Sequence, residues 1–337
     1  MGYGHFMRMI SLGQLLTDSG YEVHFATTSK IELIDNLLSK ESFIMHGMKS
    51  DALWNSSKDV SYLLNIAAQI NPAWVVIDGY QFQTDYERVI KKNGYLILRI
   101  NDFSSEHCVA DILLDQNFGA SDQKHSVEPY TVVLTGLKYL LIRREFRGIY
   151  FEKETFSKNE KTHILVSLGG GVEICEPLIL KIVKGLSKIN RTDWVAIVIT
   201  GSIKNKTKDE LLEIAQKSTW PINLIEQTTN MATEMSRADL SILSAGSIMW
   251  ESMFMKIPFL AISLTRMQAD YLKLLASKEL CDNLGWHKDL AINKLSNKVI
   301  ALAEDKLRRG KMILLADREI NRNNYGMQLL NLLNRES

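Results

Sequence analysis

The chain has 337 residues, of which 46% are hydrophobic and 23% charged, and its formal net charge is +1. This length suggests two domains of ordinary size, and the balanced charge excludes a global basic field for binding nucleic acid or an anionic membrane. The cysteines, Cys108, Cys175 and Cys281, are too widely spaced for a metal or disulfide pattern and are expected to be reduced. Because no apolar run reaches the roughly 18 residues of a membrane-spanning helix and no signal peptide is recognisable, we expect a cytoplasmic protein.

The first half of the sequence alternates between helical and strand patterns. Helical periodicity and short apolar runs follow one another along the chain. The predicted helices span 6–19, 31–38, 60–70 and 86–92, and the predicted strands span 21–27, 73–78, 95–100 and 110–115. Such alternation is typical of a doubly wound parallel sheet, whose ligands bind beyond the carboxyl ends of the strands.

Polar residues lie at or just beyond the ends of three of these predicted strands. They are Asp78, Tyr80, Asp102 and Asn117. Because parallel strands end at one edge of a sheet, these residues are candidates for the rim of one cleft. Each alone could equally be a turn residue or a helix cap.

Two glycines precede the first predicted helix, with a histidine directly after them. Gly2 and Gly4 allow a tight turn and a close approach to a ligand, because neither carries a Cβ. His5 would then lie at or next to a helix N-terminus, where free backbone N–H groups and the helix dipole favour anionic groups. This stretch therefore indicates a site for a phosphorylated substrate.

A charged segment without apolar periodicity, 151–161, is interpreted as a linker to a second domain. Beyond it the alternation of strands and helices resumes, and the final helical stretch could pack back over the first domain. The predicted strands span 163–168, 194–200, 222–225, 238–244 and 257–264, and 296–333 is mostly helical. The first of these strands runs into Gly169, Gly170 and Gly171, a turn that matches neither a Walker loop nor the dinucleotide fingerprint.

A second glycine turn follows the predicted strand 238–244. Ala245, Gly246 and Ser247 offer backbone N–H groups and a hydroxyl to a diphosphate at a helix N-terminus. Glu251 lies one helical turn further on the same face and could bridge two ribose hydroxyls. Taken by itself, Glu251 is better explained as an exposed helix carboxylate. Gln268 opens the next helix.

Five stretches, in order along the chain, resemble one known family. Residues 2–8 are similar to the G-x-G-H-x-x-R motif of the UDP-2,4-diacetamido-2,4,6-trideoxy-β-L-altropyranose hydrolases of pseudaminic acid biosynthesis, which are similar to spore-coat polysaccharide proteins. The other matching stretches are 110–117, 139–146, 164–171 and 244–251. The resemblance covers nearly the whole chain and implies an α/β fold of GT-B architecture, with two Rossmann-like parallel-sheet domains facing a cleft. The undecaprenyl-linked N-acetylglucosaminyltransferase of peptidoglycan synthesis is a more distant relative.

The same resemblance implies the domain organisation. The N-terminal Rossmann-like domain would span 1–150 and carry the catalytic histidine on the sugar side, followed by the linker at 151–161. The UDP-binding domain would span 162–315, and a C-terminal helix at 316–337 would pack back on the N-terminal domain. The family's strand before the G-x-G-H motif has no counterpart in this sequence, so we expect the N-terminal domain to lack its first strand.

Residue roles also follow from the resemblance. His5 matches the catalytic histidine, which would activate or orient water for attack at the anomeric carbon, with UDP leaving and with inversion. The matching substrate-binding positions of the first domain are Gly4, Arg8, Asp78, Tyr80 and Asn117. Those of the second domain are the glycine turn of Gly169 and Gly170, the pyrophosphate loop of Ala245, Gly246 and Ser247, the ribose ligand Glu251, and Gln268 near the phosphates or the sugar. No metal and no cofactor are implied.

The departures from the family pattern touch the sugar side more than the UDP side. Gly79 stands where relatives often carry histidine, and Asn101 where they carry aspartate. The leading hypothesis is a UDP-sugar hydrolase that releases UDP and a free 2,4-diacetamido-trideoxyhexose for nonulosonic acid synthesis. The alternatives are a GT-B glycosyltransferase and a non-catalytic nucleotide-sugar-binding protein. We expect a monomer whose partner is a UDP-linked amino sugar, without nucleic acid and without membrane insertion.

Overall fold

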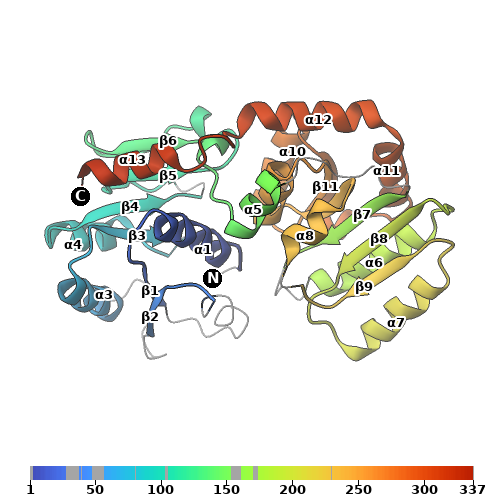
Figure 1. Ribbon diagram of the computed structural model, residues 1–337, viewed down its shortest axis with the longest axis horizontal. Coiled ribbons are helices and arrows are strands. Elements are labelled where there is room, and N and C mark those ends of the chain that lie inside the picture. The colour runs from blue at the N-terminus through green and yellow to red at the C-terminus, as the bar shows by residue number, and fades with distance from the viewer. Residues whose placement is uncertain are drawn as a thin grey trace. The chain divides into compact units, whose positions relative to one another are not determined.

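In the computed structural model the chain forms two compact units (Figure 1). One consists of Met1–Arg143 and Glu319–Ser337, and the other of Arg144–Arg318. The structure describes residues 3–27, 38, 40–47, 57–79, 81–102, 105–152, 161–169, 174–228 and 230–336. Residues 31–37 of a predicted helix, 153–160 of the predicted linker, and the predicted site residues Tyr80 and Gly170 lie outside the described residues.

The first unit contains a four-stranded parallel sheet in the order β3-β4-β5-β6 and a separate parallel pair, β1-β2. Its strands are β1 (His24–Thr27), β2 (Ile44–Gly47), β3 (Trp74–Asp78), β4 (Leu96–Ile100), β5 (Ile112–Asp115) and β6 (Val132–Thr135). Its helices are α1 (Tyr3–Asp18), α3 (Ser57–Ile70), α4 (Thr84–Lys92) and α13 (Met327–Glu336), with short 3-10 helices at Ala120–Asp122 and Leu137–Tyr139. In the register Asp78 lies beside Ile100, and Ile100 beside Leu114, so β3, β4 and β5 end at one edge.

The C-terminal helix α13 is part of the first unit's core. Its Leu329, Leu330 and Leu333 are buried in one cluster with Leu12 and Leu15 of α1. The cluster also takes in buried residues of β4 and β5, so it lies on one face of the sheet. The backbone carbonyl of Leu333 accepts a 3.1 Å hydrogen bond from the Trp74 indole of β3. The chain's last helix is therefore held on α1 and the sheet by both apolar packing and a hydrogen bond.

Two strands of the first unit have no counterpart among the predicted strands. The residues of β2 are mostly exposed, and Val132 and Val133 of β6 are exposed although apolar. Neither segment shows the continuous apolar run of a strand buried on both faces, which is the pattern that identified the inner strands β3, β4 and β5. Edge and surface strands show weaker sequence patterns, because they are held mainly by backbone pairing, which does not require a particular order of apolar side chains.

The second unit is a six-stranded parallel sheet in the order β12-β11-β10-β7-β8-β9. Its strands are β7 (Thr162–Ser167), β8 (Trp194–Ile199), β9 (Ile222–Ile225), β10 (Leu240–Ser244), β11 (Phe259–Ser263) and β12 (Asp282–Trp286). Its helices are α5 (Arg144–Glu152), α6 (Cys175–Ser187), α7 (Asn205–Gln216), α8 (Met231–Ser236), α9 (Ser247–Phe254), α10 (Arg266–Ser277), α11 (Ile292–Glu304) and α12 (Lys306–Glu319), with a 3-10 turn at His287–Asp289. The predicted α/β class with two Rossmann-like parallel sheets is confirmed.

The strand order of the second unit reverses between β7 and β10. From β7 the chain adds β8 and β9 on one side, and then returns to add β10, β11 and β12 on the other. In doubly wound sheets such a reversal opens a crevice beyond the carboxyl ends of the two strands, and ligands bind there. Among the described residues no helix is both long and apolar enough to cross a membrane.

Candidate functional site

The first group of polar residues is built by one turn of α1 and the end of β3. α1 begins at Tyr3, three residues earlier than predicted, so Gly4 lies in the first helical turn and not in a preceding loop. His5 and Arg8 are three residues apart and therefore share a helix face. Both side chains reach Asp78, the last residue of β3.

The contacts among these three side chains are short. His5 Nδ1 lies 2.9 Å from Asp78 Oδ1. Arg8 donates two hydrogen bonds to the same carboxylate, from Nη2 to Oδ1 at 2.6 Å and from Nε to Oδ2 at 3.1 Å. Such fork-shaped pairing between guanidinium and carboxylate fixes both partners in one orientation. Arg8 Nη1 also lies 3.8 Å from Asp102 Oδ2, so the guanidinium stands between two carboxylates.

Asp78 is the electrostatic centre of this group. Its side chain is buried, and burial alone would raise its pKa. The Arg8 charge and the hydrogen bonds from His5 and Arg8 outweigh burial, so the pKa of Asp78 is lowered from its usual value and the group is ionised at neutral pH. Because an ionised carboxylate only accepts hydrogen bonds, we assign the proton of His5 to Nδ1. The acceptor lone pair of the imidazole is then on Nε2. The 3.0 Å approach of Arg8 Nη2 to His5 Nδ1 follows from two donors converging on one carboxylate oxygen.

A second polar group lies at the ends of β4 and β5. Asn117 donates through Nδ2 to Asp102 Oδ1 and to Asp115 Oδ1, both at 2.9 Å. Its backbone N–H also reaches Asp115 Oδ1 at 3.1 Å, and Asn101 donates to Asp115 Oδ2 at 3.0 Å. Asp115 is fully buried, and burial raises its pKa despite these donors. Through Asp102 this group adjoins the Arg8 guanidinium, so the sequence-predicted Arg8, Asp78, Asp102 and Asn117 form one connected network.

One residue that supports this edge was not anticipated from the sequence. Arg99 is buried within β4, and its Nη2 donates to the backbone carbonyls of Gly79 at 3.2 Å and Phe82 at 2.9 Å. It thereby holds both ends of the segment that follows Asp78. Its Nη1 lies 3.5 Å from Glu87 Oε1 and has no hydrogen-bond partner among the described residues. The signal in the sequence was an arginine inside an otherwise apolar strand, which is rarely buried without a specific partner.

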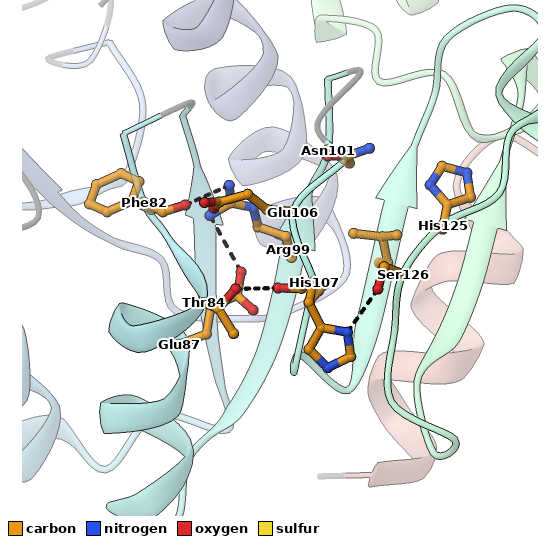
Figure 2. Close-up of a pocket in the computed structure, with 11 residues that line it drawn as sticks. Phe82, Thr84, Glu87, Arg99, Asn101, Glu106, His107, His125 and Ser126 are labelled. Carbon is orange, nitrogen blue, oxygen red and sulfur yellow. Dashed lines mark hydrogen bonds and ion pairs between the residues drawn. The ribbon is translucent and has the colours of Figure 1, made fainter.

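Arg99 and Glu87 line a very small cavity beside β4 (Figure 2). Glu87 Oε2 accepts a 2.9 Å hydrogen bond from the Val109 N–H, and burial, only partly offset by that bond and by Arg99, raises the pKa of Glu87. Thr84, from the same helical turn as Glu87, donates a hydrogen bond to the His107 backbone carbonyl, and His107 Nδ1 lies 3.0 Å from Ser126 Oγ. The cavity measures about 10 Å³, which is room for one water molecule. The cavity is too small for a sugar, and the residues around it support the sheet edge at which β3, β4 and β5 end.

The glycine turns of the second unit meet at its strand reversal. β7 and β10 are neighbours in register, with Ser167 beside Leu243, so the turns that follow them are adjacent. A Cβ added at Gly169 would lie 3.9 Å from Ser244 Oγ, and one added at Gly246 would lie 3.6 Å from the same atom. Gly169 has a φ of +77°, a conformation that glycine adopts without strain. The predicted Gly169 and Gly246 are thus brought together around Ser244.

The remaining predicted residues of the second unit have definite local roles. The N–H of Ala245 is used within the sheet, where it donates to the Ile262 carbonyl at 2.9 Å, while Gly246 is the N-cap of α9 and Ser247 its first residue. Glu251 is buried, which excludes the alternative of an exposed helix carboxylate. Gln268 closes a capping box with Thr265 at the start of α10, and its Oε1 accepts from the Leu264 N–H at 2.8 Å. Its amide nitrogen is the atom left for a ligand role.

The comparisons with solved structures define the fold class. No family model matches the chain. MurG of Acinetobacter baumannii aligns over 99% of this chain and 97% of its own, with a TM-score of 0.71 and 14% identity. The glycotransferase of kitacinnamycin aligns over 99% and 96%, also with a TM-score of 0.71 and 14% identity. The chain therefore has the GT-B fold that the sequence motifs predicted.

The chain is also similar in sequence to three curated proteins. The UDP-2,4-diacetamido-2,4,6-trideoxy-beta-L-altropyranose hydrolase of Campylobacter jejuni is 28% identical over 282 residues, which cover 82% of this chain and 93% of that protein. The spore coat polysaccharide biosynthesis protein SpsG of Bacillus subtilis is 25% identical over 52% of this chain and 50% of its own length. An uncharacterised protein of Methanocaldococcus jannaschii, MJ1062, is 29% identical over 83% of this chain, which spans only 57% of that protein. The resemblance to these hydrolases and spore-coat proteins is confirmed.

Proposed function

We propose that the chain is a UDP-sugar hydrolase. It would cleave the anomeric C–O bond of a UDP-2,4-diacetamido-2,4,6-trideoxyhexose and release UDP, in nonulosonic acid biosynthesis of the pseudaminic type. The observation that carries this proposal is the 2.9 Å contact of His5 Nδ1 with the ionised Asp78, which makes Nε2 of His5 the basic nitrogen. The similarity to the Campylobacter hydrolase over most of both chains supports the choice of substrate.

The chemistry needs one base and one leaving group. His5 Nε2 accepts a proton from water as the water oxygen attacks the anomeric carbon. The bond between that carbon and the UDP oxygen breaks, and its electron pair leaves with UDP. The imidazolium that forms is stabilised by the Asp78 carboxylate, and its proton passes to solvent afterwards. A positioned general base of this kind contributes about 10²–10⁴-fold to a rate.

Arg8 acts on the base indirectly. Its guanidinium keeps Asp78 ionised, and its two donors fix the carboxylate in the plane in which His5 meets it. The second carboxylate at Arg8, that of Asp102, is itself held by Asn117. Arg8, Asp102 and Asn117 are therefore positioning residues for the His5–Asp78 pair, and their direct contact with a sugar stays a prediction.

The nucleotide would bind in the second unit, at the reversal between β7 and β10. The N–H groups of Gly246 and Ser247 stand at the start of α9, where the helix dipole favours a diphosphate. Glycine at 169 and 246 leaves open space that side chains would fill, so a nucleotide can approach the backbone. Glu251 is proposed as the ribose ligand and Gln268 as a contact to the phosphates or the sugar.

A glycosyltransferase is the second candidate, because an apolar cavity lies beside His5 in the first unit and could receive an acceptor with an apolar tail. Both functions use the same base and the same leaving group. They differ in whether water or an acceptor hydroxyl attacks the anomeric carbon.

One experiment separates the candidates. The protein is incubated with the UDP-linked diacetamido-trideoxyhexose without acceptor, and UDP and free sugar are followed by NMR. Hydrolysis predicts release of both, lost in His5→Gln and retained in His163→Gln, a control at the start of β7 in the second unit. Release only after an acceptor is added indicates a transferase. If the protein binds UDP but releases no UDP from the UDP-linked sugar, either with or without an acceptor, the catalytic proposal is wrong.

A further inference from the structure

The four-stranded sheet of the first unit ends at β6, whose outer edge has no neighbouring strand among the described residues (Figure 1). The N–H of Val132 donates to the Asp111 carbonyl at 2.8 Å, and the N–H of Gly136 donates at 2.9 Å to the last carbonyl of β5. Because successive residues of a strand direct their backbone groups to opposite sides, Val133 and Thr135 face away from β5. The N–H and C=O groups of these two residues form no hydrogen bond within the described part of the chain.

The side chains of this edge strand are apolar although they are exposed. Val132 is 40% exposed and Val133 is 36% exposed, and the two project from opposite faces of the sheet. From Thr131 to Gly136 the strand carries no charged residue. Edge strands that stay free usually carry charges or prolines that prevent pairing with another chain. On β9, an edge strand of the second unit, the exposed residue is the polar Asn223.

An extended segment fits the edge of β6 better than a small apolar ligand does. A small ligand can cover the valines, but only an extended backbone also pairs with the outward N–H and C=O groups. Two copies of the chain can supply such a segment to each other. When identical strand edges pair about a two-fold axis, the strands run antiparallel, so the amino end of each lies beside the carboxyl end of the other.

The charges that flank β6 match this antiparallel arrangement. Glu128 precedes the amino end of β6, and Lys138 follows its carboxyl end, equally far from Val133 in the sequence. Lys138 is exposed, and it forms no ion pair within the described residues. A two-fold axis at Val133 therefore brings Glu128 of each copy toward Lys138 of the other. This self-complementary charge favours a second copy of the chain over an unrelated peptide.

We propose that two copies of the chain associate through β6, paired antiparallel about a two-fold axis at Val133. The N–H and C=O groups of Val133 pair with those of Val133 in the second copy, and the N–H of Thr135 donates to the carbonyl of Thr131. The N–H of Thr131 is already used within the chain, where it donates to the Glu128 carbonyl at 3.0 Å. The exposed valines are covered on both faces, and the two four-stranded sheets become one continuous sheet. This dimer departs from the monomer expected from the sequence, and it does not depend on the catalytic activity proposed above.

The first test is the oligomeric state of variants at Val133. Sedimentation of the full chain over a range of concentrations should show a reversible dimer. Val133→Pro removes an outward donor but none that pairs with β5, and should raise the Kd of the dimer by about tenfold or more. Val133→Thr keeps both the donor and the branched side chain, and should dimerise nearly as well as the original chain.

The second test reverses the flanking charges. Glu128→Lys alone or Lys138→Glu alone brings like charges together at both ends of the paired strands, and should raise the Kd of the dimer by roughly tenfold. The double variant restores opposite charges and should recover the dimer. The control is Glu213→Lys on α7, where the glutamate side chain is 64% exposed and no effect on dimerisation is expected.

Hydrogen exchange locates the interface. The amides of Val133 and Thr135 should exchange more slowly as the protein concentration rises, whereas those of Val132 and Leu134, which face β5, should not change. A chain that is monomeric at all concentrations would overturn the proposal. A dimer that the double charge reversal fails to restore, or whose formation leaves the exchange of Val133 and Thr135 unchanged, would overturn it as well. If Val133→Pro fails to fold, the charge reversal and the exchange data still decide the question.

Discussion

Asp78 Oδ1 and His5 Nδ1 lie 2.9 Å apart, although the two residues are 73 positions apart in the sequence. The contact decides which imidazole nitrogen is basic, because an ionised carboxylate can only accept. It also places the basic nitrogen on the side of the ring away from the buried carboxylate. The chemistry proposed for this chain therefore depends on how α1 packs against the end of β3.

Replacing Asp78 with asparagine should leave the shape of the site nearly intact and still remove most of the activity. The amide can donate to Nδ1 and so favour the wrong tautomer of His5, and it no longer stabilises the imidazolium. We expect kcat to fall by about 10²–10⁴-fold, the range for loss of general base catalysis. Binding of UDP, measured by calorimetry, should be unchanged, because the nucleotide is proposed to bind in the second unit. A loss confined to UDP affinity would contradict the role given to Asp78.

The free energy of unfolding at acid pH should depend on Asp78. Its pKa in the folded protein is lower than the usual 3.8, so the unfolded chain binds more protons at low pH. The stabilisation is complete above the usual pKa and is lost as the pH falls from there through the folded value. Urea unfolding below pH 4 should therefore show a shallower pH dependence in Asp78→Asn than in the original chain. Parallel curves would mean that Asp78 is not stabilised by Arg8 and His5 in solution.

The contribution of Glu87 to stability should change with pH in the opposite direction. Burial raises its pKa above the usual 4.5, so the folded state binds more protons than the unfolded state in this range. Its contribution to stability is complete below the usual pKa and declines as the pH rises through the folded value. Glu87→Gln should therefore flatten the fall in stability above pH 4.5, as measured by urea unfolding. An unchanged slope would indicate that Arg99 holds Glu87 ionised.

Arg99 is expected to act through the backbone that it holds. Arg99→Lys keeps the charge but cannot donate to the Gly79 and Phe82 carbonyls in the same fork. Leaving these buried groups unsatisfied should lower the free energy of unfolding by about 1–3 kcal/mol. KM for the UDP-sugar should rise more than kcat falls, because the segment after Asp78 loses its anchor. The control is Arg88→Lys on α4, where the arginine side chain is 60% exposed and no change is expected.

Alanine substitutions in the two glycine turns of the second unit should distinguish the effect of backbone strain from the effect of blocked ligand contact. An alanine at Gly169 must adopt a positive φ, so Gly169→Ala should lose about 1–2 kcal/mol of stability. Gly246 has a φ of −114°, and a Cβ there meets Ser244 Oγ at an ordinary 3.6 Å. Gly246→Ala should therefore fold as stably as the original chain and yet weaken UDP binding at least about tenfold, because the added methyl blocks the approach to the backbone. Unchanged UDP affinity in Gly246→Ala would place the diphosphate elsewhere.

The sequence predicted the fold better than the site. The inner strands are short runs buried on both faces, such as Leu96–Ile100, and the pattern alone identifies them. The motifs named His5 and Asp78 as candidate site residues, but nothing in their spacing indicates that the two side chains touch, because that contact arises from the packing of α1 on β3. The burial of Glu251 and the anchoring role of Arg99 depend on tertiary neighbours in the same way. The local sequence pattern predicts the helices and strands, whereas tertiary packing determines the partners of the polar side chains.

The last helix offers a test of how the first unit is assembled. Leu333 of α13 is 2% exposed and packs with Leu12 and Leu15 of α1, the helix that carries His5. Leu333→Ala should leave a cavity there and lower the free energy of unfolding by about 2–5 kcal/mol. Hydrogen exchange should accelerate in β4 of the first unit but not in β7 of the second. The control is Leu314→Ala on α12, where the leucine is 63% exposed and a change within about 0.5 kcal/mol is expected. If both variants were equally stable, α13 would not be part of the first unit's core, and α1 would be held by the sheet alone.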